Sequence, residues 1–175
     1  MRRWVGIFLA TTLGAGTLTS CGVPGGGVFG VMADGTAVVQ MCEGHIDGAS
    51  LYLEDPHVPE GEEPHDEKIG RWVVDPPVTG FSQFTLAHGG NGWVLNGRLQ
   101  ARDPKKRYTL AGWTSDASWT TTPVDFSEDE LAKLKPGELA GPPTEWPEDE
   151  NAPEPPNRVW TLADFTANAC QAYKY

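Results

Sequence analysis

The chain is poor in positive charge. Its 175 residues include 13 Lys and Arg against 24 Asp and Glu, which gives a formal net charge of −11. Proteins that bind nucleic acid neutralise phosphates with a basic surface, and electrostatic docking on anionic lipid headgroups needs basic residues as well. We therefore expect no nucleic-acid partner and no docking by charge on a lipid surface. An acidic balance of this kind mainly keeps a domain in solution.

Long hydrophobic runs are also scarce. The one clear run, Trp4–Leu18, has 15 uncharged residues, which is shorter than the roughly 20 that a transmembrane helix needs. Arg2 and Arg3 precede it, and a short apolar run behind a charged start is typical of a secretory signal peptide. We predict that residues 1–20 are such a peptide and are removed, and the export route stays open.

Cysteine is rare, and its three positions differ in context. Cys21 follows Leu18-Thr19-Ser20 directly behind the apolar run. This segment resembles the lipobox of bacterial lipoproteins, which implies a diacylglycerol on the Cys21 thiol, cleavage before it, and a location on the outer face of the cell membrane. Two acyl chains give a stable anchor where one gives only reversible binding. The alternative is an ordinary secreted protein in which Cys21 is half of a disulfide.

The other two cysteines, Cys42 and Cys170, remain as a natural pair. Disulfides form and persist in the oxidising compartments outside the cytoplasm. We predict a Cys42–Cys170 disulfide, and the alternative is two separately buried thiols. These cysteines are 128 positions apart in the chain. In the chain-entropy model, a bridge that closes a loop of this length stabilises the fold by roughly 4–5 kcal/mol.

The mature chain is long enough for one domain with a real core. Short runs rich in β-branched and aromatic residues alternate with turn residues, and Asp34-Gly35 is a strong two-residue hairpin signal. The spacing of these runs predicts a mostly β fold, an antiparallel β-sandwich of the immunoglobulin or fibronectin III type. The expected strands are Val28–Ala33, Thr36–Cys42, Ser50–Leu53, Arg71–Val74, Phe81–Leu86, Trp93–Leu95, Arg98–Ala101, Tyr108–Thr114 and Trp119–Val124.

Two short helices are expected to accompany the strands. Ser127 and Glu130 form a capping-box pattern before Leu131, and a second helix is expected to begin at Thr161 with an apolar stripe at 3–4 spacing. The segment between these helices, Gly141–Asn157, holds six prolines and five acids in 17 residues, so we expect an extended strap. The predicted organisation is therefore a signal peptide (1–20), a Gly-rich tether (21–27), a sandwich (28–140), the strap (141–157) and a docked C-terminal helix (158–175).

Candidate catalytic and metal-binding residues are few. The loop Glu54–Lys68 contains His57, His65 and seven carboxylates, but it lacks the spacing of a recognised metal motif, so a solvated loop is the simpler interpretation. His45 and His88 could each serve as a general base in a cleft, although histidines in turns are usually surface residues. We predict no catalytic, cofactor-binding or metal-binding residue.

Tryptophans are the most suggestive feature for binding. An exposed row of them on a sheet would stack on sugars or on a protein partner, whereas burial in the core is the commoner outcome. The sequence leaves both open for Trp72, Trp93, Trp113 and Trp119. In the expected strand Tyr108–Thr114, strand alternation puts Trp113 on the opposite side from Tyr108 and Leu110.

The chain resembles the small lipoproteins of streptomycete-type actinobacteria. The resemblance depends on three stretches, Leu18–Cys21, Val38–Gly48 and Tyr108–Thr114. It implies a location at the cell membrane and a β-sandwich fold, but it implies no activity. We therefore expect a lipid-anchored, non-catalytic binding or accessory module that has no cofactor and whose partner is a cell-wall glycan or an envelope protein. The alternatives are a small envelope hydrolase or metal-dependent enzyme, and a structural spacer.

Overall fold

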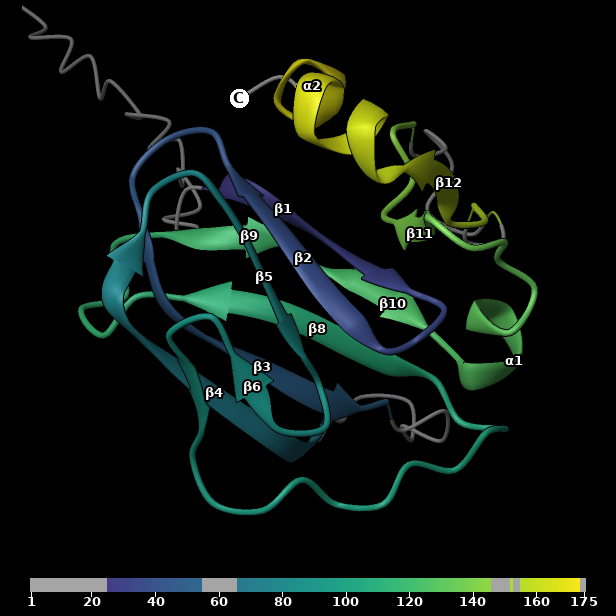
Figure 1. The fold of residues 1–175 in the computed structure, drawn as a ribbon, viewed down its shortest axis with the longest axis horizontal. Coiled ribbons are helices and arrows are strands. Elements are labelled where there is room, and N and C mark those ends of the chain that lie inside the picture. Colours follow the sequence, from purple (N-terminus) through teal and green to yellow (C-terminus); the bar gives the residue numbers. More distant parts are fainter. Residues whose placement is uncertain (1–24, 55–65, 146–151, 153–154, 174–175) are drawn as a thin grey trace, which may run out of the picture.

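The computed structural model describes residues 25–54, 66–145, 152 and 155–173. The predicted signal peptide, Cys21 and most of the acidic loop that holds His57 and His65 lie outside these residues. Figure 1 shows the fold. The strands are β1 (Gly25–Met32), β2 (Thr36–Met41), β3 (Ile46–Leu53), β4 (Glu67–Val78), β5 (Phe81–Thr85), β6 (Gly89–Gly90), β7 (Trp93–Leu95), β8 (Tyr108–Trp113), β9 (Thr120–Thr122), β10 (Val124–Phe126), β11 (Glu138–Gly141) and β12 (Arg158–Thr161), and the helices are α1 (Glu128–Leu131) and α2 (Leu162–Ala172).

Nine of these strands form a closed barrel. Neighbouring strands follow the order β8-β3-β4-β7-β6-β5-β2-β1, and β9 joins the two ends of this series by pairing with both β1 and β8. In the closing seam β9 is parallel to β1, with Gly25 opposite Thr120 and Val28 opposite Thr122, and it is antiparallel to β8. The expected sandwich is therefore wrong, although the mostly β composition with two helices is confirmed. One wall closes on itself, where a sandwich would have two separate sheets with open edges.

Aromatic side chains fill much of the barrel interior. Phe84 lies at the centre of this group: its ring is 4.3 Å from that of Trp93, 5.4 Å from that of Trp72 and 6.5 Å from that of Phe29, measured between centroids. All four side chains are buried. Offset and edge-to-face aromatic contacts of this kind add to the free energy of apolar burial, so the interior is a packed core.

A second apolar cluster lies outside the barrel wall, beneath α2. Trp160 and Phe165 meet edge to face in it, with Val28 and Val38 of the barrel strands and Ala169 of the helix also buried there. Figure 1 shows α2 beside β12, over the strands β1 and β2. The predicted disulfide is present, because Cys42, which follows β2, is bonded to Cys170 of α2.

The local signals at turns and helix starts are confirmed. Gly35 has a φ of +77° between β1 and β2, and its N–H donates to the carbonyl of Met32. Ser127 and Glu130 form the expected capping box of α1, and Thr161 caps α2. These features depend on two to four adjacent residues, which is why the sequence displays them directly.

Two glycine-rich segments form part of the barrel wall. Gly25–Gly27 belongs to β1, so the wall begins inside the predicted tether. A Cβ at Gly26 would lie 2.7 Å from the ring of Trp119, and one at Gly27 would lie 2.5 Å from Met41 Sδ. Gly89–Gly90 forms the strand β6, which pairs with β5 and β7. The glycines at 26 and 27 thus allow close packing.

Strands at both ends of the predicted strap were not expected. β11 and β12 pair antiparallel, with Gly141 opposite Arg158, so the proline-rich segment connects two neighbouring strands of the sheet. β11 also pairs with β1 and thereby attaches this extension to the barrel. The segment Arg98–Ala101, expected as a strand, has no regular structure. Within the described part of the chain, no helix has the length and apolar character that a membrane span requires.

Candidate functional site

Two of the four candidate tryptophans belong to the core. Trp72 and Trp93 are buried, and Trp93 Nε1 donates to Ser82 Oγ at 2.9 Å. Strand alternation points both indoles into the barrel, so the hypothesis of an aromatic surface is wrong for these two residues. Trp119 is half-buried, and its ring lies against the backbone of Gly26 and Gly44.

Trp113 is the candidate that lies on the outer face. The burial of β8 alternates, with Tyr108, Leu110 and Gly112 buried and Trp113 half-buried. The indole crosses onto the neighbouring strand, because a Cβ at Gly48 of β3 would lie only 2.3 Å from its Cζ2. Trp113 Nε1 also donates to Ser50 Oγ at 3.1 Å. The ring is therefore held in one position on the barrel surface.

Beside Trp113 the outer face is hollowed. The hollow has a volume of about 300 Å³ and lies over β3, β4 and the end of β8. Its lining consists of Ser50, Tyr52, Lys68, Arg71, Trp113, Thr114 and Ser115. Hydroxyl groups, two cationic side chains and two aromatic rings thus meet in one small space, and such convergence of polar and aromatic groups is characteristic of binding sites.

A β-bulge in β4 brings both cations to this face. Lys68 and Arg71 are three residues apart, and in a regular strand they would point to opposite faces. The register between β3 and β4 shifts at this point, since Leu51 pairs with Gly70 while Tyr52 pairs with Lys68. Ile69 is the extra residue and is buried, whereas Lys68 and Arg71 are both exposed. Bulges often redirect a side chain in this way at functional sites.

Each cation lies over an aromatic ring. The guanidinium carbon of Arg71 is 4.1 Å from the ring centroid of Trp113, and Lys68 Nζ is 5.6 Å from that of Tyr52. Contacts of this kind stabilise a cation by roughly 0.5–1 kcal/mol at exposed sites. Trp113 is thus enclosed between the backbone of Gly48 and the guanidinium of Arg71, so its ring serves as a support for Arg71.

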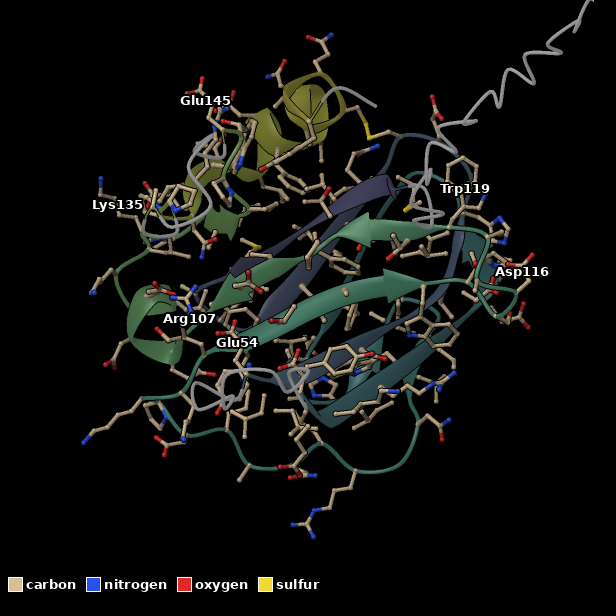
Figure 2. All side chains as sticks on the ribbon, turned by 180° about the vertical axis from the view of Figure 1, so that it is seen from behind. Glu54, Arg107, Asp116, Trp119, Lys135 and Glu145 are labelled. Carbon is tan, nitrogen blue, oxygen red and sulfur yellow. A yellow bond between two sulfur atoms is a disulfide. The ribbon has the colours of Figure 1, made fainter. Side chains whose placement is uncertain are left out.

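The two cations form no ion pair within the described part of the chain. No carboxylate there lies within ion-pair distance of Lys68 or Arg71, whereas Arg107 pairs with Glu54 at 3.5 Å and with Glu130 at 3.1 Å. Figure 2 shows Arg107 beside Glu54 at one end of the barrel, with Asp116 and Trp119 at the other end. The ion pairs of Arg107 join the end of β3 to α1.

The candidate general bases do not complete a catalytic arrangement. His45 Nε2 lies 3.6 Å from Asp47 Oδ1. Asp47 Oδ2 accepts hydrogen bonds from the hydroxyl and the backbone N–H of Ser115, the latter at 2.7 Å. The carboxylate therefore stands between the hydroxyl and the imidazole, while a nucleophilic triad needs the imidazole in the middle. His88 is exposed in the turn after β5.

Hydrogen bonds lower the pKa of Asp47. The hydroxyl of Ser115 is the main cause that lowers the pKa of Asp47 below its usual 3.8, and the backbone N–H of Ser115 adds to it. These hydrogen bonds keep the carboxyl of Asp47 ionised to lower pH than usual, and they fasten the turn after β8 to the start of β3. Among the described residues, no group of three or more His, Cys, Asp or Glu could hold a metal ion.

Trp113 was identifiable from the sequence, but its neighbours in the hollow were not. The sequence does not predict that Tyr52, Lys68 and Arg71 share a face with Trp113. The bulge at Ile69 breaks the strand alternation that would assign them to one face. Comparison with protein-family models, with curated proteins and with solved structures gave no match.

Proposed function

We propose that this protein is a lipid-anchored, non-catalytic binding module on the outer face of the cell membrane. The anchor is the diacylglyceryl group on Cys21, supported by the charged start, the 15-residue apolar run and the small residues before Cys21. The Cys42–Cys170 disulfide agrees with an oxidising compartment outside the cytoplasm. The ligand is a component of the cell envelope, a wall glycan.

The observation that carries the binding role is the hollow beside Trp113. Arg71 and Lys68 are displayed on aromatic supports, and the bulge at Ile69 is what places both on one face. Neither cation forms an ion pair among the described residues, so the charge of both is available to a ligand. The order hydroxyl, carboxylate, imidazole at Ser115, Asp47 and His45 favours binding over hydrolysis.

Sedimentation with purified cell walls tests the binding role. The mature domain, without its lipid, is mixed with insoluble wall material, and the bound fraction is measured at increasing wall concentration. We expect saturable binding that weakens in Arg71→Ala. Arg158→Ala is the matched control, because Arg158 also stacks on a tryptophan, Trp160, at 3.7 Å and lies on β12, away from the hollow. Equal loss in both variants, or no binding by the parent domain, would contradict the proposal.

Mass spectrometry of the protein from intact cells tests the anchor. We expect the N-terminal peptide to begin at Cys21 and to carry the mass of the lipid. In Cys21→Ala the protein should leave the membrane fraction. A native protein whose Cys21 peptide has no lipid would rule out the anchored form and leave the binding role to be judged by sedimentation.

A further inference from the structure

The guanidinium of Arg71 lies over an aromatic ring and keeps its N–H donors. Its central carbon is 4.1 Å from the ring centroid of Trp113, and a guanidinium that stacks on an aromatic ring can still use the N–H donors at its edge. Those donors match the two oxygens of a carboxylate or a phosphate. The ring of Trp113 is itself fixed by Ser50 and Gly48, so Arg71 is held in position before a ligand arrives, which reduces the entropy lost on binding.

The rest of the hollow suits a small hydroxylated ligand. Its volume of about 300 Å³ is at the lower end of small-molecule sites, which is enough for one ring-sized unit. The hydroxyl of Tyr52 can exchange hydrogen bonds with the hydroxyls of a sugar. The hydroxyl of Ser115, which donates to Asp47, can accept one, and Lys68 adds a second positive charge. The net charge of −11 opposes long polyanions, so a single acidic group is favoured over a chain of them.

We infer that the hollow formed by Tyr52, Lys68, Arg71 and Trp113 binds one acidic sugar unit, with its carboxylate or phosphate on the edge of Arg71. The inference depends on the proposed binding function and specifies its ligand. Arg71 receives the anionic group and Lys68 contributes charge from the neighbouring position across the bulge. The sugar ring lies against the part of Tyr52 that remains exposed.

Titration with three sugars shows whether the hollow prefers a carboxylate, a phosphate or no acidic group. Glucuronate supplies a carboxylate, glucose 6-phosphate supplies a phosphate, and glucose supplies neither. Each is titrated into the mature domain while the indole N–H of Trp113 and the Nε–H of Arg71 are followed by NMR. We expect both signals to shift with at least one acidic sugar, with an affinity about tenfold above that for glucose, which corresponds to one charge-assisted contact. The acidic sugar that binds more tightly identifies the source.

Variants of Arg71 distinguish the paired hydrogen bonds of its guanidinium from its positive charge. Arg71→Ala should remove the preference for the acidic sugar, and Arg71→Lys should restore only part of it, because an ammonium group cannot form two parallel hydrogen bonds to one acid. Lys68→Ala should weaken the binding of acidic sugars and leave glucose unchanged. Arg158→Ala, which removes an Arg–Trp stack elsewhere, should leave every affinity unchanged.

Several results would overturn the inference. Glucose binding as tightly as the acidic sugars would show that the hollow recognises hydroxyls alone. Shifts absent from Trp113 and Arg71 with all three sugars would show that no acidic sugar binds there. If the domain still sediments with cell walls in either case, the proposed binding function stands and only the inference of an acidic sugar ligand is wrong. If the domain does not sediment with cell walls either, both the binding function and the acidic ligand are wrong.

Discussion

Cys170 of the last helix is bonded to Cys42, directly after β2 and 128 residues earlier in the chain. The bond therefore fastens α2, near the C-terminal end of the described residues, to a strand near their N-terminal end. The helix also buries Phe165 and Ala169 against the wall, so disulfide and apolar contacts act on the same interface. Of these two, the disulfide acts mainly by limiting the unfolded chain.

Removal of the disulfide should lower stability more than any surface change. For a loop of this length the chain-entropy model gives about 4–5 kcal/mol, and we expect Cys42→Ser/Cys170→Ser to lose a comparable amount in the free energy of unfolding. Urea denaturation of the purified domain measures it. The parent protein under reducing conditions is the control and should match the double variant. A loss below about 1 kcal/mol would mean that the apolar interface alone holds α2.

Gly44 should resist substitution because Trp119 covers it. A Cβ there would lie 2.4 Å from the indole, and the φ of Gly44 is +62°. Gly137 is the control, since its φ is +84° and a Cβ added to it would meet nothing within 4 Å. Gly137→Ala should cost about 1 kcal/mol for the backbone alone, and Gly44→Ala about 1–3 kcal/mol more for the clash. Equal thermal shifts in the two variants would contradict the steric argument.

The seam of the barrel depends on a side-chain hydrogen bond. The backbone N–H of Gly112 donates to Thr121 Oγ1 at 2.8 Å, and Thr121 is buried. Thr121→Val keeps the shape but leaves this N–H unsatisfied, so we expect a loss of about 1–3 kcal/mol. Thr121→Ser, which keeps the hydroxyl and loses a methyl group, should cost about 1 kcal/mol. Chemical denaturation compares them, and a smaller loss for Val than for Ser would show that the hydrogen bond contributes little.

Acid should weaken the turn that Asp47 holds. Its pKa is lowered in the folded protein by the hydroxyl and N–H of Ser115, so its stabilising contribution is present above pH 3.8, the usual value, and is lost as the pH falls through the lower folded value. Ser115→Ala removes the main cause and should raise the pKa of Asp47 towards that usual value. NMR titration of the Asp47 carboxyl measures the shift directly. An unchanged pKa would contradict the role of the hydroxyl, and Asp47→Asn should abolish this part of the pH dependence.

Local features were predictable because a few adjacent residues determine them. The turn at Asp34-Gly35 and the cap at Ser127 follow from turn and capping preferences. Closure of the barrel was not predictable, because β9 is short and its pairing with β1 joins residues about 95 positions apart in sequence. A sandwich and a barrel both consist of short alternating strands, so the pattern that suggested the first is equally compatible with the second.

The candidate site was only partly predictable for a related reason. Trp113 follows the simple alternation of β8, and the sequence placed it on the opposite side from Tyr108 and Leu110, as the structure does. Lys68 and Arg71 reach the same face through a bulge, which depends on how β4 pairs with β3 and has no local signature. The burial of Trp72 likewise depends on which face of β4 the closed barrel encloses.

The start of β1 at Gly25 has a mechanical consequence. The strand that leaves the proposed anchor enters the barrel wall within four residues of Cys21, and it pairs with β2 on one side and with β9 and β11 on the other. A pull on the start of β1 along the strand would load these hydrogen bonds in shear, so many would have to break together before β1 could slide out. If the proposed anchor on Cys21 is present, the barrel would therefore resist unfolding when the chain is pulled from that end.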